Sequence, residues 1–259
     1  IRHLRENRQR IGQQIAIIGD QLEHKVRQAE DAADSLRRWR EELDAVYSGI
    51  PTTPIMVSLA HHVKTLGIPK AYFEELIKGV EMDLFNNRYI TFDELSLYCY
   101  RVASVVGLIC LHIFGVTSAR AQDYAVALGM AFQLTNILRD VGTDAAERRI
   151  YLALDDLQKW NYPEKAMLNR SYSAEFRALM EYEASRAHHY YKRADAALKE
   201  LPSHERRALT VAEIMRGIYS RILDRIERSN YQVFGPRISL TTTQRVVIAL
   251  RVWLRSRFS

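Results

Sequence analysis

The sequence predicts an all-α protein, and three observations carry that prediction. Its 259 residues include only six prolines and eleven glycines, so long uninterrupted helices are allowed. Apolar residues recur at helical spacing, whereas the alternation typical of half-buried strands is almost absent. Hydrophobic residues make up 47% and charged residues 26%, as in a globular protein with a substantial core. We therefore expect a single domain over residues 1–259.

The charge of the chain narrows the classes of partner. The formal net charge is +6, from 37 basic and 31 acidic residues. The arginines and lysines are spread along the chain without a recognised nucleic-acid-binding motif, so nucleic acid is not expected as a partner. Anionic diphosphate substrates or an anionic membrane surface account for the charge at least as well. The sequence does not fix the oligomeric state.

The composition is typical of a cytoplasmic protein. No run of 18 uninterrupted apolar residues occurs, so no membrane-spanning helix is expected. The basic N-terminal stretch has no apolar segment before a cleavage site, and it does not fit a signal peptide. Cys99 and Cys110 are the two cysteines, and both lie in an apolar stretch, where we expect reduced thiols. Peripheral contact with the inner face of a membrane is compatible with this localisation.

Capping and breaking residues delimit the predicted helices. In the first 28 residues, four apolar side chains keep helical spacing: Ile11, Ile15, Ile18 and Leu22. The next helix is expected to run through Val46 and to stop at Ser48-Gly49. Thr91 and Glu94 form a capping box at the start of an apolar helix that ends near Gly115. Further helices are expected over residues 55–66, 70–84, 118–141, 154–160, 176–198, 202–230 and 241–258.

Two of these segments have faces of contrasting character. In the helix after Thr91, one face carries Tyr98, Val102, Val105, Val106 and Ile109, which fits either plain core or the wall of an apolar tunnel. The C-terminal segment 241–258 is amphipathic. One side carries Arg245, Arg251 and Arg255, and the other carries Val246, Leu250, Trp253 and Leu254. Such a helix either docks on the domain or touches a membrane surface.

The stretch GMAFQLTNILRDVGTDAAERRIYL, residues 129–152, gathers polar side chains on one helix face. At 100° per residue, an arc of about 60–80° holds Gly129, Gln133, Asn136, Asp140 and Asp144. Carboxylates on an otherwise buried helix are costly unless a cation neutralises them. Hard oxygen ligands of this kind suit Mg²⁺ that is shared with substrate phosphates. The same spacing also fits an amphipathic surface helix whose acids face water.

A second acidic face lies in VRQAEDAADS, residues 26–35. On a helix, four charged side chains fall within about 100° of one another: Arg27, Glu30, Asp31 and Asp34. This set fits a second metal-binding motif, and it equally fits a solvated face with pairing between successive turns.

The amino-acid sequence of these stretches resembles the motifs of a known family. QLTNILRDVGTD followed by RRIYL resembles the second aspartate-rich motif of the squalene/phytoene synthase family, the head-to-head prenyl transferases. VRQAEDAADS is similar to the family's Asp-Asp-x-x-Asp motif, with Glu30 in place of the first aspartate. MDLFNNRYITFDELSLYCYRVASVVGL and NYQVFGPRISL look closest to the presqualene diphosphate synthases of bacterial hopanoid pathways. The resemblance begins near Arg27, so residues 1–28 are divergent or incomplete.

The resemblance implies a fold and a set of site residues. The fold is a helical bundle of the isoprenoid-synthase type around a central apolar cavity. The implied Mg²⁺ ligands are Glu30, Asp31, Asp34, Asn136, Asp140 and Asp144. The implied substrate-binding residues are Arg27, Val102, Val106, Gln133, Arg139, Arg149, Tyr151 and Tyr231. Tyr98, which matches a tyrosine of the reaction cavity, joins Asp140 and Asp144 as a catalytic residue. On ideal helix geometry Arg139 points away from the acidic face, so its role rests on the resemblance alone.

The resemblance also implies a reaction. We expect Mg²⁺-dependent condensation of two farnesyl diphosphates to presqualene diphosphate, with release of diphosphate. Squalene, dehydrosqualene or phytoene synthesis are alternatives within the family, and a non-catalytic assembly or binding protein is the alternative from another class. NADPH is not expected as a cofactor. No glycine-rich dinucleotide loop is present, although the family's squalene synthases need none.

Overall fold

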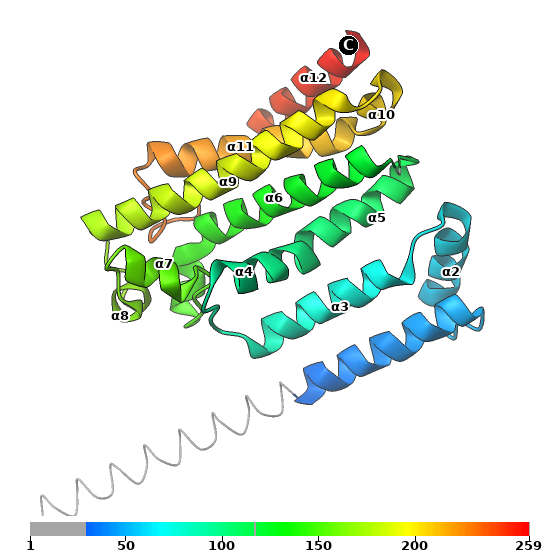
Figure 1. The fold of residues 1–259 in the computed structure, drawn as a ribbon, viewed down its shortest axis with the longest axis horizontal. Helices are drawn as coiled ribbons and strands as arrows, with labels where there is room; N and C mark the ends of the chain where they lie inside the picture. The colour runs from blue at the N-terminus through cyan, green and yellow to red at the C-terminus, as the bar shows by residue number, and fades with distance from the viewer. Residues whose placement is uncertain (1–29, 117, 259) are drawn as a thin grey trace, which may run out of the picture. The chain divides into compact units, whose positions relative to one another are not determined.

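The computed structural model describes residues 30–116 and 118–258, with side chains through Ser256. These residues are largely helical and contain no strand, so the predicted all-α class is confirmed (Figure 1). The chain divides into two compact units, residues 1–57 and 58–259. The expectation of one domain stays a prediction. Arg27 lies outside the described residues.

The first unit contains a helix over residues 30–48. It ends where the sequence predicts, because Gly49 adopts the left-handed conformation at φ 80°. The amide of Ile50 then donates to the carbonyl of Ala45 at 2.9 Å, which satisfies one of the last helical carbonyls. Leu36, Leu43 and Val46 are buried, as expected for one apolar side of a helix.

The helices that follow agree with the predicted breaks. They are α2 (Pro54–Leu66), α3 (Lys70–Phe85), α4 (Phe92–Cys99), the π-helix η1 (Tyr100–Ser104), α5 (Val105–Phe114), α6 (Ala119–Ala146), α7 (Leu154–Lys159), α8 (Glu164–Leu168), α9 (Ala174–Glu200), α10 (Ser203–Ala208), α11 (Thr210–Arg228) and α12 (Thr242–Phe258). The unit boundary falls within α2. The first of the two hydrogen bonds of the predicted capping box is present, since the amide of Glu94 donates to Thr91 Oγ1 at 3.3 Å.

Three boundaries differ from the prediction. Helix α6 extends to Ala146, so Asp144 lies in its last turn and not in a frayed end. Pro163 caps the short helix α8, where a linker was expected. The segment predicted as one helix over 202–230 is broken at Leu209, whose fully buried side chain and ψ of 9° separate α10 from α11.

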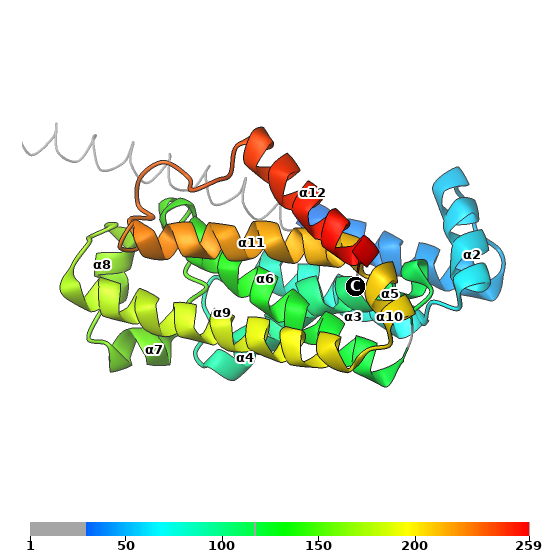
Figure 2. The same cartoon turned by 90° about the horizontal axis from the view of Figure 1, so that it is seen from above.

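Helix α6 is the centre of the second unit, with α9 and α11 on one side and α3, α4 and α5 on the other (Figures 1 and 2). Buried residues occur on nearly all its sides. Gly129 allows the closest approach, because a Cβ there would lie 2.5 Å from the Cα of Ser104. Ser104 Oγ donates to the carbonyl of Val126 at 2.9 Å, which joins η1 to α6. Gly129 therefore serves packing.

The π-helical turn η1 changes the predicted face of the helix after Thr91. A π-turn uses more residues per turn than an α-helix, so the residues that follow it rotate relative to those before it. Val105 is fully buried whereas Val106 is 40% exposed, and Val102 is partly buried against the core. An uninterrupted α-helix would place these side chains on one face with Tyr98. The π-turn interrupts the helix, so the expectation of one continuous face is wrong.

The helical run Phe92–Phe114 is long and apolar enough to cross a membrane by length and composition alone. That finding differs from the sequence expectation, which required an uninterrupted apolar stretch. In the structure α4, η1 and α5 all pack against α6 in the bundle (Figure 1). Core helices of globular proteins have the same composition, so this property does not identify a membrane span.

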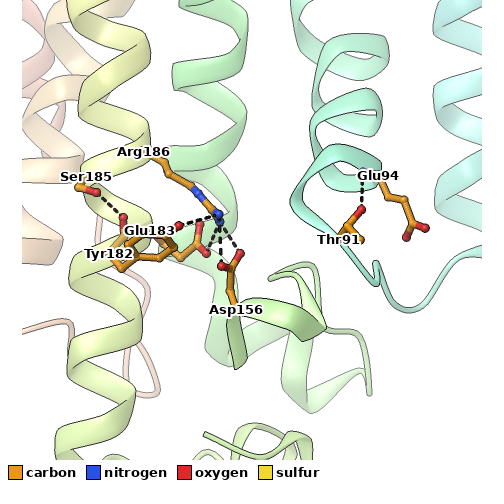
Figure 3. A network of polar contacts seen from close by, with 7 residues as sticks. All are labelled: Thr91, Glu94, Asp156, Tyr182, Glu183, Ser185 and Arg186. Carbon is orange, nitrogen blue, oxygen red and sulfur yellow. Dashed lines mark hydrogen bonds and ion pairs between the residues drawn. The ribbon is translucent and has the colours of Figure 1, made fainter. Parts of the chain in front are cut away.

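A buried ion cluster joins α7 to α9 (Figure 3). Arg186 donates from both terminal nitrogens to Asp156 and from Nη1 to Glu183 Oε1 at 2.7 Å. Asp156 is 5% exposed and Glu183 is 1% exposed. The guanidinium also lies over the rings of Phe92, at 3.9 Å, and Tyr182, at 4.5 Å. This closed cluster fixes α7, and with it the segment that follows α6, on the bundle.

Candidate functional site

Two loops run together at the C-terminal end of α6. The segment after α6 pairs with the loop after α3, through hydrogen bonds from Ile150 N to Asn87 O at 3.2 Å and from Leu154 N to Tyr89 O at 2.9 Å. Arg88 Nη1 adds a bond to the carbonyl of Arg148 at 2.8 Å. This pairing brings the end of α3 to the acidic end of α6.

Asp83, on the last turn of α3, is the acceptor at the centre of this junction. Tyr151 donates its hydroxyl to Asp83 Oδ1 at 2.5 Å, and Tyr98 donates to the same oxygen at 3.1 Å. Arg149 Nη1 donates to Asp83 Oδ2 at 3.3 Å and to the Tyr151 hydroxyl at 3.2 Å. Three predicted site residues are thus brought together by a carboxylate that the sequence analysis did not select.

The tyrosines of this junction stay protonated. The rings of Tyr98 and Tyr151 stack at 5.5 Å between centroids, and Tyr89 lies 5.4 Å from Tyr98. Burial, reinforced by the hydrogen bond to Asp83 and its charge, raises the pKa of Tyr151 to about 12. Burial also raises the pKa of Tyr98, with added repulsion from Tyr151 and Asp83. Both hydroxyls are therefore hydrogen-bond donors at neutral pH.

Asp140 is held by two arginines. Arg139 donates from Nε at 2.9 Å and from Nη2 at 2.5 Å, and Arg237 donates from Nε at 2.8 Å and from Nη2 at 2.9 Å. Burial alone would raise the pKa of Asp140, but these two guanidinium groups lower it below its usual value. The expectation that Arg139 points away from the acidic face is wrong, because its side chain folds back onto the next residue.

Asp144 and Asn136 are less well satisfied. Burial raises the pKa of Asp144 to about 7, with further repulsion from Asp140 and Glu147 and partial compensation from Arg149. Asn136 Oδ1 is buried without a hydrogen-bond partner. A crevice beside Asp144 is lined by Arg149, Tyr151 and apolar side chains. The last three turns of α6 thus carry a carboxyl group whose ionised form is poorly compensated and an amide oxygen without a hydrogen-bond partner.

These donors fit Mg²⁺. Two carboxylates and an amide oxygen lie on consecutive turns of one helix, and hard oxygen ligands are what Mg²⁺ requires. Among the described residues, no three acidic, histidine or cysteine side chains come together as a metal site. A Mg²⁺ ion at Asn136, Asp140 and Asp144 would therefore need further oxygens, and the oxygens of a diphosphate substrate can supply them.

The other predicted site residues are placed as follows. Glu30, Asp31 and Asp34 of the first unit are exposed, and Asp34 pairs with Arg37 at 2.9 Å. Gln133 is half-buried on α6. Burial raises the pKa of Tyr231 to about 12, and the charges that modify this shift are those of Glu227, Glu181 and Arg177, none of which lies on α6. The roles assigned to these residues stay predictions.

The structure adds two residues that the sequence analysis missed, Asp83 and Arg237. Asp83 lies within the quoted stretch MDLFNNRYITFDEL, and Arg237 lies within NYQVFGPRISL. Neither has a local spacing signal, since each meets its partners only through tertiary contacts. A larger cavity of about 580 Å³ lies elsewhere, between α10, α11 and α12, and contains none of the predicted site residues.

Comparison with known proteins identifies the family. A helical bundle whose central helix carries carboxylate and amide oxygens beside arginine and tyrosine donors has groups suited to a metal ion and to a diphosphate. The family model described as squalene/phytoene synthase matches residues 11–244. The chain therefore belongs to the squalene/phytoene synthase family, whose members are prenyl transferases.

Curated relatives and solved structures agree with this assignment. The 15-cis-phytoene synthase of Synechocystis sp. is 36% identical over 92% of this chain and 73% of its own length. The phytoene synthase of Arthrospira platensis is 38% identical over 86% of this chain and 76% of its length. The squalene synthase HpnC from Alicyclobacillus acidocaldarius superposes with a TM-score of 0.70, at 27% identity over 77% of this chain and 74% of that one. A dehydrosqualene synthase in complex with ligand gives 0.78, at 25% identity over 89% and 81%.

Proposed function

We propose that this protein catalyses the Mg²⁺-dependent head-to-head condensation of two prenyl diphosphates. The observation that carries the proposal is the junction at the end of α6, where Asn136 Oδ1 is buried without a hydrogen-bond partner and Asp144, whose pKa is raised by burial, lies beside Arg149 and Tyr151. Oxygen ligands for a cation and donors for an anion are thus adjacent, as binding of a metal diphosphate requires. When bound, Mg²⁺ neutralises the diphosphate and makes it a better leaving group.

The reaction balances without an oxidant or reductant. The carbon–oxygen bond of one allylic diphosphate breaks, and the electron pair leaves with the diphosphate. The double bond of the second prenyl chain attacks the allylic cation, and loss of a proton closes a cyclopropane ring. The products are a cyclopropylcarbinyl diphosphate, free diphosphate and a proton. Burial of the reacting carbons is required, because water would quench the cation.

The chain's own residues serve this step as donors and as walls. Arg149 and Tyr151 face the acidic end of α6 and can donate to the departing diphosphate. Tyr98, which stays protonated, stacks on Tyr151 and holds it over Asp83. Aromatic rings at this position also favour a neighbouring cation electrostatically. The acids of α6 act as metal ligands and not as a proton-transferring pair.

The released product is the finer part of the proposal. We take presqualene diphosphate from two farnesyl diphosphates as the first candidate, on the resemblance of residues 80–108 and 229–240. Phytoene from two geranylgeranyl diphosphates is the second candidate, favoured by the 36% and 38% identity to cyanobacterial phytoene synthases. A non-catalytic binding role is disfavoured by the retained Asp140 and Asp144.

A product assay tests both candidates. The protein is incubated with Mg²⁺ and either farnesyl or geranylgeranyl diphosphate, with and without NADPH, and dephosphorylated extracts are analysed by mass spectrometry. Presqualene alcohol from farnesyl diphosphate, with no effect of NADPH, is expected. Squalene formed only with NADPH, or a forty-carbon product formed faster than any thirty-carbon one, would replace the first candidate. No product from either substrate would refute the enzymatic proposal.

Helix α12 supports the proposal that the protein makes peripheral contact with a membrane. It packs on α11 at Gly217 through Ile248 and Val252, and the predicted apolar side remains outward. That side is 45–54% exposed at Val246, Leu250, Trp253 and Leu254. The helix carries arginines and no acidic residue. An exposed apolar side with basic flanks is suited to an anionic lipid surface, where an apolar product would also be delivered.

A further inference from the structure

The carboxylate of Asp140 has no free position for a metal ion in this structure. An ionised carboxylate offers about four lone-pair directions. Arg139 and Arg237 take all four, because each donates one bond to Oδ1 and one to Oδ2. A cation can reach Asp140 only after one guanidinium group withdraws.

The two arginines differ in their freedom to withdraw. The side chain of Arg139 is 12% exposed and belongs to the residue next to Asp140 on α6. The side chain of Arg237 is 60% exposed and comes from a segment 97 positions away in the chain. Water solvates the exposed Arg237 guanidinium when it leaves, and Asp140, which is 20% exposed, still keeps its bonds to Arg139. Arg237 is therefore the partner that can leave at low cost.

Arg237 is carried by residues 231–241, which we call the strap. After α11 the chain turns through Asn230 and Tyr231, both in the left-handed conformation. The strap then crosses α6 in direct contact, because a Cβ on Gly142 would lie 2.4 Å from the carbonyl oxygen of Val233. Phe234 packs on Phe176 of α9 with 4.5 Å between ring centroids. These contacts hold the strap on α6 and α9 and place Arg237 over Asp140.

We propose that Arg237 is a built-in counter-cation of Asp140, which yields this carboxylate to Mg²⁺ and then pairs with the diphosphate of the substrate. The inference rests on the proposed function. The strap keeps the guanidinium within reach of the site after it withdraws, and a guanidinium matches diphosphate oxygens as well as it matches a carboxylate. Arg237 thus acts twice, first by preventing repulsion between the free carboxylates and then as a substrate ligand.

Binding measurements without turnover test this role. MgCl₂, and then inorganic diphosphate at saturating Mg²⁺, are titrated into the full-length wild-type, Arg237→Gln and Arg237→Lys proteins by calorimetry. In Arg237→Gln the affinity for Mg²⁺ alone should rise about threefold to tenfold, because a competing cation is gone. The affinity for diphosphate should fall about tenfold. Arg237→Lys, which keeps the charge, should lie between the other two for both ligands.

Arg221→Gln is the matched control, since Arg221 pairs with Asp224 at 3.3 Å on an exposed part of α11. It should change neither affinity, and circular dichroism should show every variant folded. Unchanged Mg²⁺ affinity in Arg237→Gln would overturn the counter-cation role, even if diphosphate binding weakens. Absence of turnover by wild-type protein that still shows these affinity changes would instead remove the proposed reaction. Binding of neither ligand by wild type would overturn both.

Discussion

Two clusters of carboxylates and arginines lie at the same end of the bundle, and they differ in how far they are closed. In the first, Arg186 is enclosed by Asp156, Glu183 and two aromatic rings, and the acids are 5% and 1% exposed (Figure 3). In the second, Asp140 is bound by an arginine that is itself 60% exposed. Each cluster has a buried side-chain oxygen without a hydrogen-bond partner, Glu183 Oε2 in the first and Asn136 Oδ1 in the second, so the exposure of the arginine is what separates the two clusters.

The difference separates a structural ion cluster from a binding site. The formation of a closed cluster stabilises the fold only a little, because desolvation of the charges offsets their attraction. Removal of one partner, however, leaves buried charges without solvent or a counter-ion. An open cluster can exchange its partners, because water or a ligand replaces the group that leaves. We therefore expect mutations in the closed cluster to affect stability, and mutations in the open cluster to affect ligand binding and turnover.

The largest expected effect is on turnover in the open cluster. Asp140→Asn and Asp144→Asn should each lower turnover about 10²–10⁴-fold, because an amide holds Mg²⁺ less strongly than a carboxylate does. Thermal unfolding should change little, since both side chains are partly solvated. Steady-state rates over a Mg²⁺ series, with product detected by mass spectrometry, measure the effect.

Asp123→Asn is the control for these two variants, because Asp123 lies on the same helix and pairs with Arg120 in solvent, 62% exposed. Its turnover should equal that of the wild type. Near wild-type turnover of Asp140→Asn or Asp144→Asn at limiting Mg²⁺ would contradict the metal-ligand assignment.

The next effect is on stability in the closed cluster. Arg186→Ala should lower the free energy of unfolding by about 3–5 kcal/mol, since it leaves Asp156 and Glu183 buried without their cation. Arg120→Ala, which removes only exposed pairs with Asp123 and Glu200, should cost less than about 1 kcal/mol. Urea denaturation at neutral pH compares the two. Equal losses would mean that enclosure does not determine how much stability is lost with the arginine.

The contrast between the clusters also shows what the sequence can predict. Helix boundaries at Gly49 and Thr91 follow from local backbone chemistry and were predictable, whereas the short helix that begins after Pro163 was not predicted. The alignment of Asn136 and Asp144 follows from helical periodicity. These features depend on residues within two or three turns of one another, which is the range over which sequence patterns are informative.

Features that depend on distant residues were not predictable. Asp83 meets Tyr151 across 68 positions, and Arg237 meets Asp140 across 97. The π-turn at Tyr100–Ser104 has no spacing signal in the sequence either. It lies where α6 packs closely on Ser104 at Gly129, a contact between distant parts of the chain. The sequence therefore predicted the fold class and the polar residues on one face of α6. It did not predict Asp83 and Arg237, because these residues meet the site only in the packed structure.

The smallest effect, a pH dependence, sharpens the comparison. Burial raises the pKa of Glu183 above its usual value, with Arg186 opposing the shift and Asp156 adding to it. Between the unfolded and the folded pKa of Glu183, the folded protein holds a proton that the unfolded chain has lost, so the stability that this group contributes falls as pH rises.

The variant Glu183→Gln tests this dependence, because a glutamine side chain cannot lose that proton. From pH 5 to pH 8, the free energy of unfolding of wild type should therefore fall relative to Glu183→Gln by about 1–3 kcal/mol. Other titrating groups, Asp144 among them, are common to both proteins and cancel in this difference. Urea denaturation at several pH values measures it, and a difference that stays constant would show that Glu183 is already ionised in its enclosed site.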